Sequence, residues 1–311
     1  MIDLLIITYN GREFTKNAIT SAISNTVKPQ KVILVDNNST DGTVQYIKDN
    51  FDFVEIISLP YNAGYGKAIN IGMKSAVSPF VVVSNNDVIF PDNFFEKLIA
   101  SLKQLDNNTG VLGVQQLFPD GSFQNSYGRF HNIIGGFLDI CFFSVLEIRF
   151  KKIIWKFGLN KKVKKVGYVD GALLCINKTA FEKVGGFDEN FFFYSEEVDL
   201  CKRMQKSGFK ILFDPNIEVI HYRGQGIKNN IGLSENKVDL FVESRIKYCR
   251  KHLSDLETKI YILLEAIFYQ ELGILHFLKR LIKANSNRDN SKICFLISKR
   301  FFGELKNNIN F

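Results

Sequence analysis

The stretch Val81-Val82-Val83-Ser84-Asn85-Asn86-Asp87 decides the fold class, because a β-branched apolar run ends there directly in polar residues. Similar runs recur through the first hundred residues and predict buried strands over 4–8, 31–35, 54–59 and 80–83. Amphipathic stretches between them predict helices over 13–24, 43–50 and 62–77, the second of them capped by Asp41. Strands that alternate with helices are typical of βαβ units. The sequence therefore predicts an α/β fold, with a mostly parallel central sheet flanked by helices.

Acidic or glycine-rich signals follow the ends of the expected strands. They are Ile6-Ile7-Thr8-Tyr9-Asn10, Val35-Asp36-Asn37-Asn38-Ser39, Asn62-Ala63-Gly64-Tyr65-Gly66-Lys67, Ser84-Asn85-Asn86-Asp87 and Ser195-Glu196-Glu197-Val198-Asp199-Leu200. In an open α/β sheet, the loops at the carboxyl ends of the strands converge on one crevice. We therefore expect these acids to meet around a single ligand, which indicates an enzyme.

Asp87 is the candidate metal ligand. Asn85-Asn86-Asp87 is a variant of an Asp-x-Asp arrangement, in which a carboxylate binds a divalent cation that bridges a nucleoside diphosphate. Hard cations such as Mg²⁺ take oxygen ligands, and one or two carboxylates suffice where phosphate and water fill the remaining positions. The alternative is a polar turn that caps the helix expected after Pro91-Asp92.

Asp36 and the glycine-rich stretch that begins at Asn62 are the candidate nucleotide ligands. Asp36 directly follows a strand, where its carboxylate can accept hydrogen bonds from a nucleobase or ribose, or can simply close the turn. Gly64 and Gly66, with Lys67 at a helix start, suit a diphosphate or ribose that approaches the backbone closely. The stretch matches neither standard phosphate-binding motif. A role of the glycines in helix packing fits equally well.

The acids after Phe192-Phe193-Tyr194 are the candidate catalytic groups. If Ser195 caps a helix there, Glu196 and Glu197 lie in its first turn, where the helix dipole favours their anionic forms. Asp199 and Arg203 are spaced for an ion pair within that helix. All four charges could merely stabilise the helix, an alternative that is strong for Asp199 and weaker for Glu197, because the preceding aromatic residues suggest a pocket wall.

His221 follows the apolar run Ile217-Glu218-Val219-Ile220. A histidine at the end of a strand can add a nitrogen ligand to a metal or contact a phosphate. A buried, hydrogen-bonded structural histidine is the alternative.

Composition excludes several classes of protein. The chain has 311 residues, enough for one large domain and an appendage, and its five cysteines show neither zinc-site nor disulfide spacing. We expect a reducing compartment and no exported leader, and no uncharged run reaches the roughly 20 residues that span a bilayer. From 256 to 282 apolar residues recur at helical spacing, which predicts a small C-terminal helical extension.

The net charge of +8 is concentrated in one stretch, which contains eight basic residues and no acid between Ile148 and Val169. A local patch indicates a docking surface and disfavours nucleic-acid binding. Together with the apolar residues from Ile133 to Leu146, residues 133–165 could form an element that lies on an anionic membrane. A buried helix followed by a solvated lysine loop is the alternative, and periodicity does not separate the two.

The order of these motifs over residues 1–227 resembles the family 2 glycosyltransferases of the GT-A fold, in particular their rhamnosyltransferase-like branch. The resemblance implies an inverting hexosyltransferase that uses a nucleotide-diphosphate sugar, Mg²⁺ or Mn²⁺, and a glycan or lipid-linked glycan acceptor in cell-surface polysaccharide synthesis. It places the catalytic domain at residues 1–230 and a C-terminal helical region at 231–311. It also implies a cytoplasmic protein, peripheral on the inner face of the membrane.

The resemblance also assigns roles to individual residues, which fall into four groups. The nucleotide-sugar ligands would be Thr8, Tyr9, Asn10, Asp36, Asn62, Gly64, Lys67, Asn85 and Asn86; the sugar or acceptor pocket Gly171 and Ala172; the metal ligands Asp87 and His221; and the catalytic base Glu197 or Glu196. Two features depart from the family pattern: the metal motif has fewer carboxylates than Asp-x-Asp, and Glu196-Glu197 replaces the usual Glu-Asp pair.

The implied chemistry is consistent on physical grounds. A sugar hydroxyl is a poor nucleophile, so a carboxylate within hydrogen-bond reach must accept its proton as the new bond forms. A cation on the opposite side stabilises the charge of the departing diphosphate, and this arrangement leads to inversion. The competing hypothesis is a noncatalytic nucleotide- or glycan-binding module, associated with the membrane, that uses Glu197 only as a helix cap.

Overall fold

The computed structural model describes residues 1–159, 161–223, 235–282 and 288–307. The described residues fall into two compact units. The first contains Met1–Arg129, Lys152–Phe192 and the residues from Glu196 to 223; the second contains Phe130–Lys151, Phe193–Ser195 and the described residues from 235 onward. The boundary predicted at 230 lies outside the described residues.

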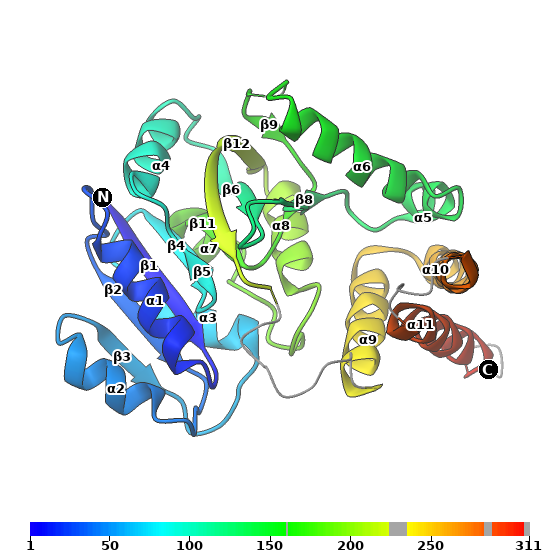
Figure 1. Ribbon diagram of the computed structural model, residues 1–311, viewed down its shortest axis with the longest axis horizontal. Helices are drawn as coiled ribbons and strands as arrows, with labels where there is room; N and C mark the ends of the chain where they lie inside the picture. Colours follow the sequence, from blue (N-terminus) through cyan, green and yellow to red (C-terminus); the bar gives the residue numbers. More distant parts are fainter. Residues whose placement is uncertain (160, 224–234, 283–287, 308–311) are drawn as a thin grey trace. The chain divides into compact units, whose positions relative to one another are not determined.

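Half of the central sheet of the first unit is parallel (Figure 1). Its strands are β1 (Ile2–Thr8), β2 (Val32–Asp36), β3 (Glu55–Ser58) and β4 (Phe80–Asn85), in the spatial order β3-β2-β1-β4. Every residue of β1 and β2 is buried. Strands covered on both faces read as continuous apolar runs, which is why the sequence revealed them. The predicted α/β fold with a mostly parallel sheet is confirmed for this half.

The other half of the sheet is mixed. β11 (Leu173–Asn177) runs antiparallel to β4 and to β6 (Thr109–Leu117), and β12 (Lys210–His221) runs parallel to β6. The short strands are β5 (Val88–Ile89), β7 (Phe123–Gln124) and β9 (Lys164–Lys165) in this sheet, and β8 (Tyr127–Gly128) and β10 (Tyr168–Val169), which form a separate pair. β5 pairs with the end of β12, so the segment after β4 lies beside His221.

Helices cover both faces of the sheet. They are α1 (Arg12–Ile23), α2 (Thr43–Asn50), α3 (Tyr65–Met73), α4 (Phe94–Lys103), α7 (Lys178–Lys183) and α8 (Glu196–Lys206). The cap expected at Asp41 is wrong in position, because Gly42 is the N-cap residue of α2; Asp41 lies one residue earlier, where its Oδ1 accepts from the backbone N–H of Thr43 at 3.1 Å. The helix expected over 62–77 is shorter than predicted, because residues 62–64 form a loop that ends on Gly64.

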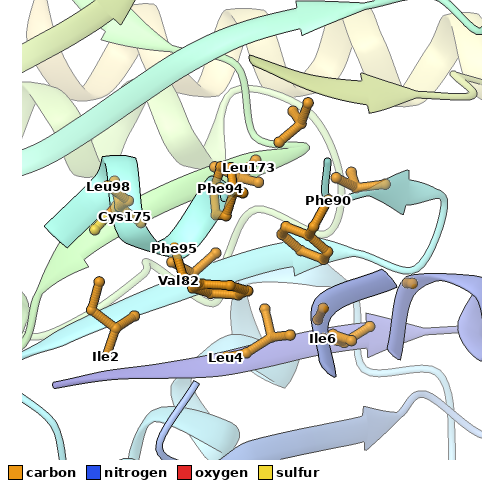
Figure 2. Close-up of a cluster of buried hydrophobic side chains, with 14 of the residues drawn as sticks. Ile2, Leu4, Ile6, Val82, Phe90, Phe94, Phe95, Leu98, Leu173 and Cys175 are labelled. Carbon is orange, nitrogen blue, oxygen red and sulfur yellow. The ribbon is translucent and has the colours of Figure 1, made fainter. Parts of the chain in front are cut away.

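The core forms two layers, because side chains alternate between the faces of a strand. Leu4 and Ile6 face one cluster, to which α1, α2 and α4 contribute; Figure 2 shows Phe94, Phe95 and Leu98 packed there. The next residues along the strands face the opposite way, where α3 approaches so closely that Gly72 lies against Leu5 and Val35.

The second unit is helical. Its helices are α5 (Ile133–Ile140), the first part of α6 (Phe143–Lys156), α9 (Glu235–His252), α10 (Asp255–Ile282) and α11 (Arg288–Asn307). Its core is formed by Val238, Val242, Ile246, Ile262, Ala266, Ile297 and Phe301. α5 packs on α10, where a Cβ on Gly136 would lie 3.2 Å from Leu264 and Tyr261. The helical extension predicted at the C-terminus therefore also includes residues from before the basic stretch.

The helices α5 and α6 decide between the two hypotheses for residues 133–165. Within the described residues, α6 buries none of its side chains and Gly136 is the one buried residue of α5. The alternative of a buried helix is therefore wrong for α6, whereas α5 is partly covered by α10.

Helix α10 is long and apolar enough to cross a membrane by length and composition, which the search for uncharged runs did not reveal. The core helix of a helical unit has the same length and composition. Tyr261, Ile262 and Ala266 of α10 are buried within the helical unit.

Gly72 supplies a test of the packing between α3 and the sheet. In Gly72→Ala the new Cβ would lie 2.4 Å from Leu5 Cδ1 and 2.8 Å from Val35 Cγ2. We expect this overpacking to lower the free energy of unfolding by about 1–3 kcal/mol, measured by urea unfolding followed by circular dichroism. Gly303→Ala is the matched control, because nothing lies within 4 Å of that helical position. There alanine should leave stability unchanged or raise it by about 0.5–1 kcal/mol. Equal effects of the two substitutions would contradict the packing.

Candidate active site

The end of β1 is joined to the loop after β4 by side-chain hydrogen bonds. The amide nitrogen of Asn86 donates to Thr8 Oγ1 at 2.9 Å, and the hydroxyls of Thr8 and Thr15 lie 2.8 Å apart. A Cβ on Gly11 would lie 2.3 Å from Asn86 Nδ2, so glycine is needed for this approach. Thr8 is buried, and its hydroxyl is engaged within the protein. The network fixes the loops at the carboxyl ends of β1 and β4, while direct contact of Thr8 and Asn86 with a nucleotide stays a prediction.

Asn10 joins the loops after β1 and β2. Its backbone N–H donates to Ser39 Oγ at 2.9 Å, and its side-chain oxygen accepts from the backbone N–H of Thr40 at 2.7 Å. Asn10 has a φ of 49°, a left-handed conformation that asparagine tolerates better than most residues. The neighbouring Tyr9 is 45% exposed, so its ring is accessible to a ligand.

Asp36 closes the turn after β2, as one of its two expected roles requires, and its contact with a nucleotide stays a prediction. Its Oδ2 accepts from the backbone N–H of Ser39 at 3.0 Å and so closes the turn. Its Oδ1 is buried and has no hydrogen-bond partner. A buried acceptor without a donor is costly, and a hydroxyl or N–H from a ligand can satisfy it.

The loop before α3 is held by Asn37, which sequence reasoning quoted without assigning it a role. Its side chain donates to the carbonyl of Gly64 and accepts from the backbone N–H of Ala63, at 3.1 and 2.9 Å. The Asn62 side chain accepts from the N–H of Gly64 at 3.1 Å. Gly64 has a φ of 84°, and a Cβ there would lie 2.6 Å from the carbonyl oxygen of Phe192. Gly64 is therefore required by both its conformation and this close approach.

The two remaining members of the glycine-rich stretch behave differently. Gly66 packs on Phe187, and a Cβ added at Gly66 would lie 3.0 Å from the Cβ of Phe187. The helix-packing alternative predicted such a contact. Lys67 lies 3.5 Å from Glu189 and near the ring of Tyr61. Hydrogen bonding to Tyr61 and the charge of Glu189 raise the pKa of Lys67, so this exposed group is cationic at neutral pH.

Asp87 and His221 are brought together by the pairing of β5 with β12. The backbone N–H of Tyr222 donates to the carbonyl of Asp87 at 3.0 Å, and His221 Nε2 lies 3.4 Å from Asp87 Oδ1. Both side chains are buried. The sequence separates these residues by more than a hundred positions and could place them together only through the resemblance.

Two glutamines define the tautomer of His221. Gln116 and Gln124 present their side-chain oxygens to His221 Nδ1, at 3.0 and 2.9 Å. Their amide nitrogens donate elsewhere, to Asp170 and to the backbone carbonyl of His221, which fixes the orientation of both amides. Nδ1 therefore carries the proton, and in the neutral ring the lone pair of Nε2 faces Asp87 Oδ1.

A lone pair that faces a carboxylate oxygen needs a proton or a cation between them. Asp87 Oδ1 is buried without a hydrogen-bond partner, which fits a cation held by one oxygen and one nitrogen ligand. Among the described residues there is no cluster of three or more His, Cys, Asp or Glu side chains suited to a metal. Asp87 and His221 would therefore hold a divalent ion whose remaining ligands are phosphate oxygens and water.

Tyr65 lies at the centre of the acidic part of the site. Its hydroxyl donates to the carbonyl of Gly171 at 2.5 Å, and its backbone N–H donates to the carbonyl of Phe192. Burial raises the pKa of Tyr65, and nearby carboxylates, among them Glu197, Asp170 and Asp87, raise it further. Tyr65 therefore joins α3 to the turn at Gly171, against which Glu197 packs.

Asp170 and Tyr65 are site residues that sequence reasoning missed. Asp170 Oδ1 accepts from the backbone N–H of Ala172 at 3.1 Å, and its Oδ2 lies 3.4 Å from Arg223. Ala172 accepts from the backbone N–H of Asn85, which joins this turn to the end of β4. The sequence feature that could have identified Asp170 is its position directly before Gly171 and Ala172, which were predicted to line the sugar or acceptor pocket.

The two adjacent glutamates have different environments. Glu196 is 4% exposed, and its Oε2 is buried without a hydrogen-bond partner. Burial, and then the charge of Glu197, raises the pKa of Glu196 well above its usual range. Glu197 is half-buried and lies against Gly171, where a Cβ would be 3.7 Å from its Cβ and Cγ atoms. Glu197 is therefore the accessible carboxylate of the pair.

The rest of the α8 N-terminus is structural. Tyr194 and Ser195 both have positive φ angles, so the chain turns sharply before it enters α8. Arg203 Nε donates to Asp199 Oδ2 at 2.7 Å, which confirms the expected pair. Another Arg203 nitrogen donates to the carbonyl of Val184. Asp199 is thus engaged in holding the helix in place.

Sequence profiles place this architecture in a known class. The family described as "Glycosyl transferase family 2" matches residues 3–185, more than half of the chain, and "N-terminal domain of galactosyltransferase" matches residues 154–223. The chain belongs to glycosyltransferase family 2, as the order of its motifs predicted.

Individual relatives agree with this assignment. The N-acetylglucosaminyl-diphospho-decaprenol L-rhamnosyltransferase of Mycobacterium tuberculosis is 29% identical over 72% of this chain and 76% of its own length. Rhamnosyltransferase WbbL of Escherichia coli K12 is 20% identical over 71% of this chain and 83% of its own length. These similarities support the predicted rhamnosyltransferase-like branch.

Solved structures show the same fold. GalNAc-T7 with UDP, GalNAc and Mn²⁺ matches 99% of this chain with a TM-score of 0.60 and 16% identity, and this chain spans 57% of that chain. Mannosyltransferase PcManGT from Pyrobaculum calidifontis, in complex with GDP-Man and Mn²⁺, matches 99% of this chain and 87% of that chain, with a TM-score of 0.57 and 13% identity. The predicted GT-A fold is confirmed.

The burial of Glu196 predicts a pH dependence of stability. Because its pKa in the folded protein is raised above the ordinary value of 4.5, the folded state retains a proton that the unfolded state loses. The free energy of unfolding should fall as the pH rises from the ordinary value of 4.5 towards the raised pKa of Glu196, by at most about 1.4 kcal/mol per pH unit. Glu196→Gln should remove this fall, as measured by urea unfolding between about pH 5 and about pH 8. The exposed Glu182, replaced in the same way, is the control. A fall of equal size in Glu196→Gln and wild type would contradict the assignment.

Proposed function

We propose that this chain is an inverting, metal-dependent glycosyltransferase that moves a sugar from a nucleotide-diphosphate sugar to a lipid-linked glycan. The observation that supports the proposal is that Glu197 packs against Gly171, while the adjacent Ala172 accepts a hydrogen bond from the backbone N–H of Asn85, two residues before Asp87. A cation ligand and an accessible carboxylate in one site are the two groups that this transfer requires.

The donor occupies the carboxyl ends of β1, β2 and β4. The free oxygen of Asp36 accepts a hydrogen bond from the nucleoside, and Tyr9 offers an exposed ring beside it. Gly64 and Asn62 shape the loop along which the diphosphate lies, with Lys67 as a nearby cation. Asp87 and His221 would hold the divalent ion, which can be Mg²⁺ or Mn²⁺. When bound, that ion stabilises the charge that develops on the departing diphosphate.

Glu197 is the base of the proposed reaction. Its carboxylate accepts the proton of the acceptor hydroxyl while the hydroxyl oxygen bonds to the anomeric carbon. The bond from that carbon to the diphosphate oxygen breaks, and its electron pair leaves with the nucleoside diphosphate. Burial of Glu196 favours its protonated form, which carries no second negative charge beside the base. Tyr65 and Asp170 hold the Gly171–Ala172 turn that forms the wall of the sugar pocket.

The relatives suggest the donor and acceptor classes. Both are named as rhamnosyltransferases, and the first acts on a diphospho-decaprenol lipid. We infer a rhamnose or related hexose donor and an isoprenoid-diphosphate-linked glycan acceptor, in cell-surface polysaccharide synthesis. Such an acceptor is held in the membrane, so the protein works at its cytoplasmic face.

Asp87 tests the role of the cation. Asp87→Asn removes the charge that holds the ion, and we expect a loss of turnover of roughly 10²-fold or more, which excess Mn²⁺ restores only in part. Donor hydrolysis measured against the Mn²⁺ and Mg²⁺ concentration reports this. Asp92→Asn, in the same segment but exposed, should behave as wild type. Unchanged metal dependence in Asp87→Asn would exclude the proposed cation site.

Glu197 tests the reaction itself and separates it from the noncatalytic alternative. Glu197→Gln keeps the size of the side chain but cannot accept the proton. We expect turnover to fall by roughly 10²- to 10⁴-fold, with the affinity for the donor nearly unchanged by calorimetry. Glu182→Gln is the exposed control. If wild type binds nucleotide sugars but transfers none to any acceptor, the binding-module hypothesis replaces the enzyme.

A further inference from the structure

Helix α6 carries a continuous apolar stripe on its exposed side. Its members follow each other at spacings of three and four residues, which places them on one face of a helix. They are Phe143, Leu146, Phe150, Ile153 and Phe157, and each is between 44% and 67% exposed. Phe157 continues the helical turn beyond α6, because its backbone N–H donates to the carbonyl of Ile153. The stripe was not visible from composition alone.

The opposite side of α6 is attached to the first unit. Trp155 lies two residues from both Ile153 and Phe157, about 200° around the helix from each of them. Its ring lies 5.8 Å from that of Phe123, and its indole N–H donates to Glu218 at 3.2 Å. Trp155 thus anchors the end of α6, from Lys152 onward, within the first unit, and Ile153 and Phe157 lie on the other side of the helix from it.

A stripe of this size calls for a covering partner. Single exposed apolar residues are common, whereas contiguous exposed patches mark sites of interaction with proteins or membranes. The preceding helix α5 adds Ile134 and Phe137, three residues apart and 74% and 61% exposed. We call these exposed apolar residues of the two consecutive helices the α5–α6 surface.

The charge beside the stripe favours a lipid partner. Arg149, Lys152 and Lys156 are exposed on α6, and Lys161, Lys162 and Lys165 are exposed just after it. The one acid of α6, Glu147, is paired with Lys151 at 2.9 Å. Apolar side chains flanked by basic ones match a layer of acyl chains beneath anionic head groups.

We propose that α6 lies in the interface of an anionic phospholipid membrane, with its apolar stripe among the acyl chains and its basic residues at the head groups. This proposal rests on the proposed function in one respect: binding to the membrane would bring the protein close to a lipid-linked acceptor. A second copy of the chain is a poorer partner, because a two-fold interface would bring two sets of basic residues together. An anionic membrane offers acyl chains to the apolar residues and negatively charged head groups to the basic residues.

Flotation of the full chain with lipid vesicles tests the proposal. We expect the protein to float with vesicles that contain phosphatidylglycerol and to remain at the bottom with phosphatidylcholine alone. High salt should weaken the binding, because the electrostatic part is screened. The double variant Phe150→Ser/Phe157→Ser should bind roughly tenfold or more weakly, since two large apolar side chains no longer enter the membrane.

Two controls make the outcome specific. Phe53→Ser removes a residue of the first unit that is also 51% exposed, and it should float as wild type does. Glu197→Gln should float normally while it loses turnover, so failure of the proposed function and failure of this inference give different results. A wild type that does not float, or a double variant that floats as well as wild type, would overturn the inference. A wild-type dimer that the double variant dissociates, without flotation, would instead assign the surface to self-association.

Discussion

Buried negative charge is the constraint on which the site depends. Asp36, Asp87 and Glu196 each have one carboxylate oxygen that is buried without a hydrogen-bond partner. A charge that leaves water without a partner costs several kcal/mol, so each of these groups must be satisfied by a proton, a cation or a ligand. For Glu196 burial itself favours the proton. Asp87 faces a histidine lone pair, which suits a cation, and Asp36 lies where a nucleoside can donate to it.

The sheet explains why these groups meet. In the order β3-β2-β1-β4, β2 and β4 lie on either side of β1. The chain therefore leaves β1 towards one edge of the sheet for β2 and β3 and returns past it to β4, and ligands bind at such switch points. Asp36 lies at the end of β2, Thr8 at the end of β1, and Asp87 just after β4. The mixed half of the sheet contributes the other side, since β12 ends at His221 and pairs with β5 beside Asp87.

Much of this arrangement could be predicted from the sequence. The parallel strands are continuous apolar runs because both of their faces are buried, and Asp41 and the Asp199–Arg203 pair act over a few residues. Asp170 and Tyr65 could not be assigned in this way. Their importance comes from the hydrogen bonds that Tyr65 makes to Gly171 and Asp170 makes to Ala172; only the position of Asp170 before these two residues marks it in the sequence.

The two hypotheses for residues 133–165 were also separated only by the fold. Periodicity identifies an apolar face but not what covers it, so a buried helix and an exposed one give the same pattern. The structure leaves α6 without a buried side chain and packs α5 on α10, far along the chain.

By itself, the sequence determined the α/β class, the strands whose ends carry the site, and the family, because these depend on short-range periodicity and on the order of motifs. The tertiary structure alone decided which glutamate is buried, which tautomer His221 adopts and which side of α6 is exposed. Each of these depends on burial and on partners that lie tens to hundreds of residues away, and a carboxylate or imidazole acquires its chemistry from that environment.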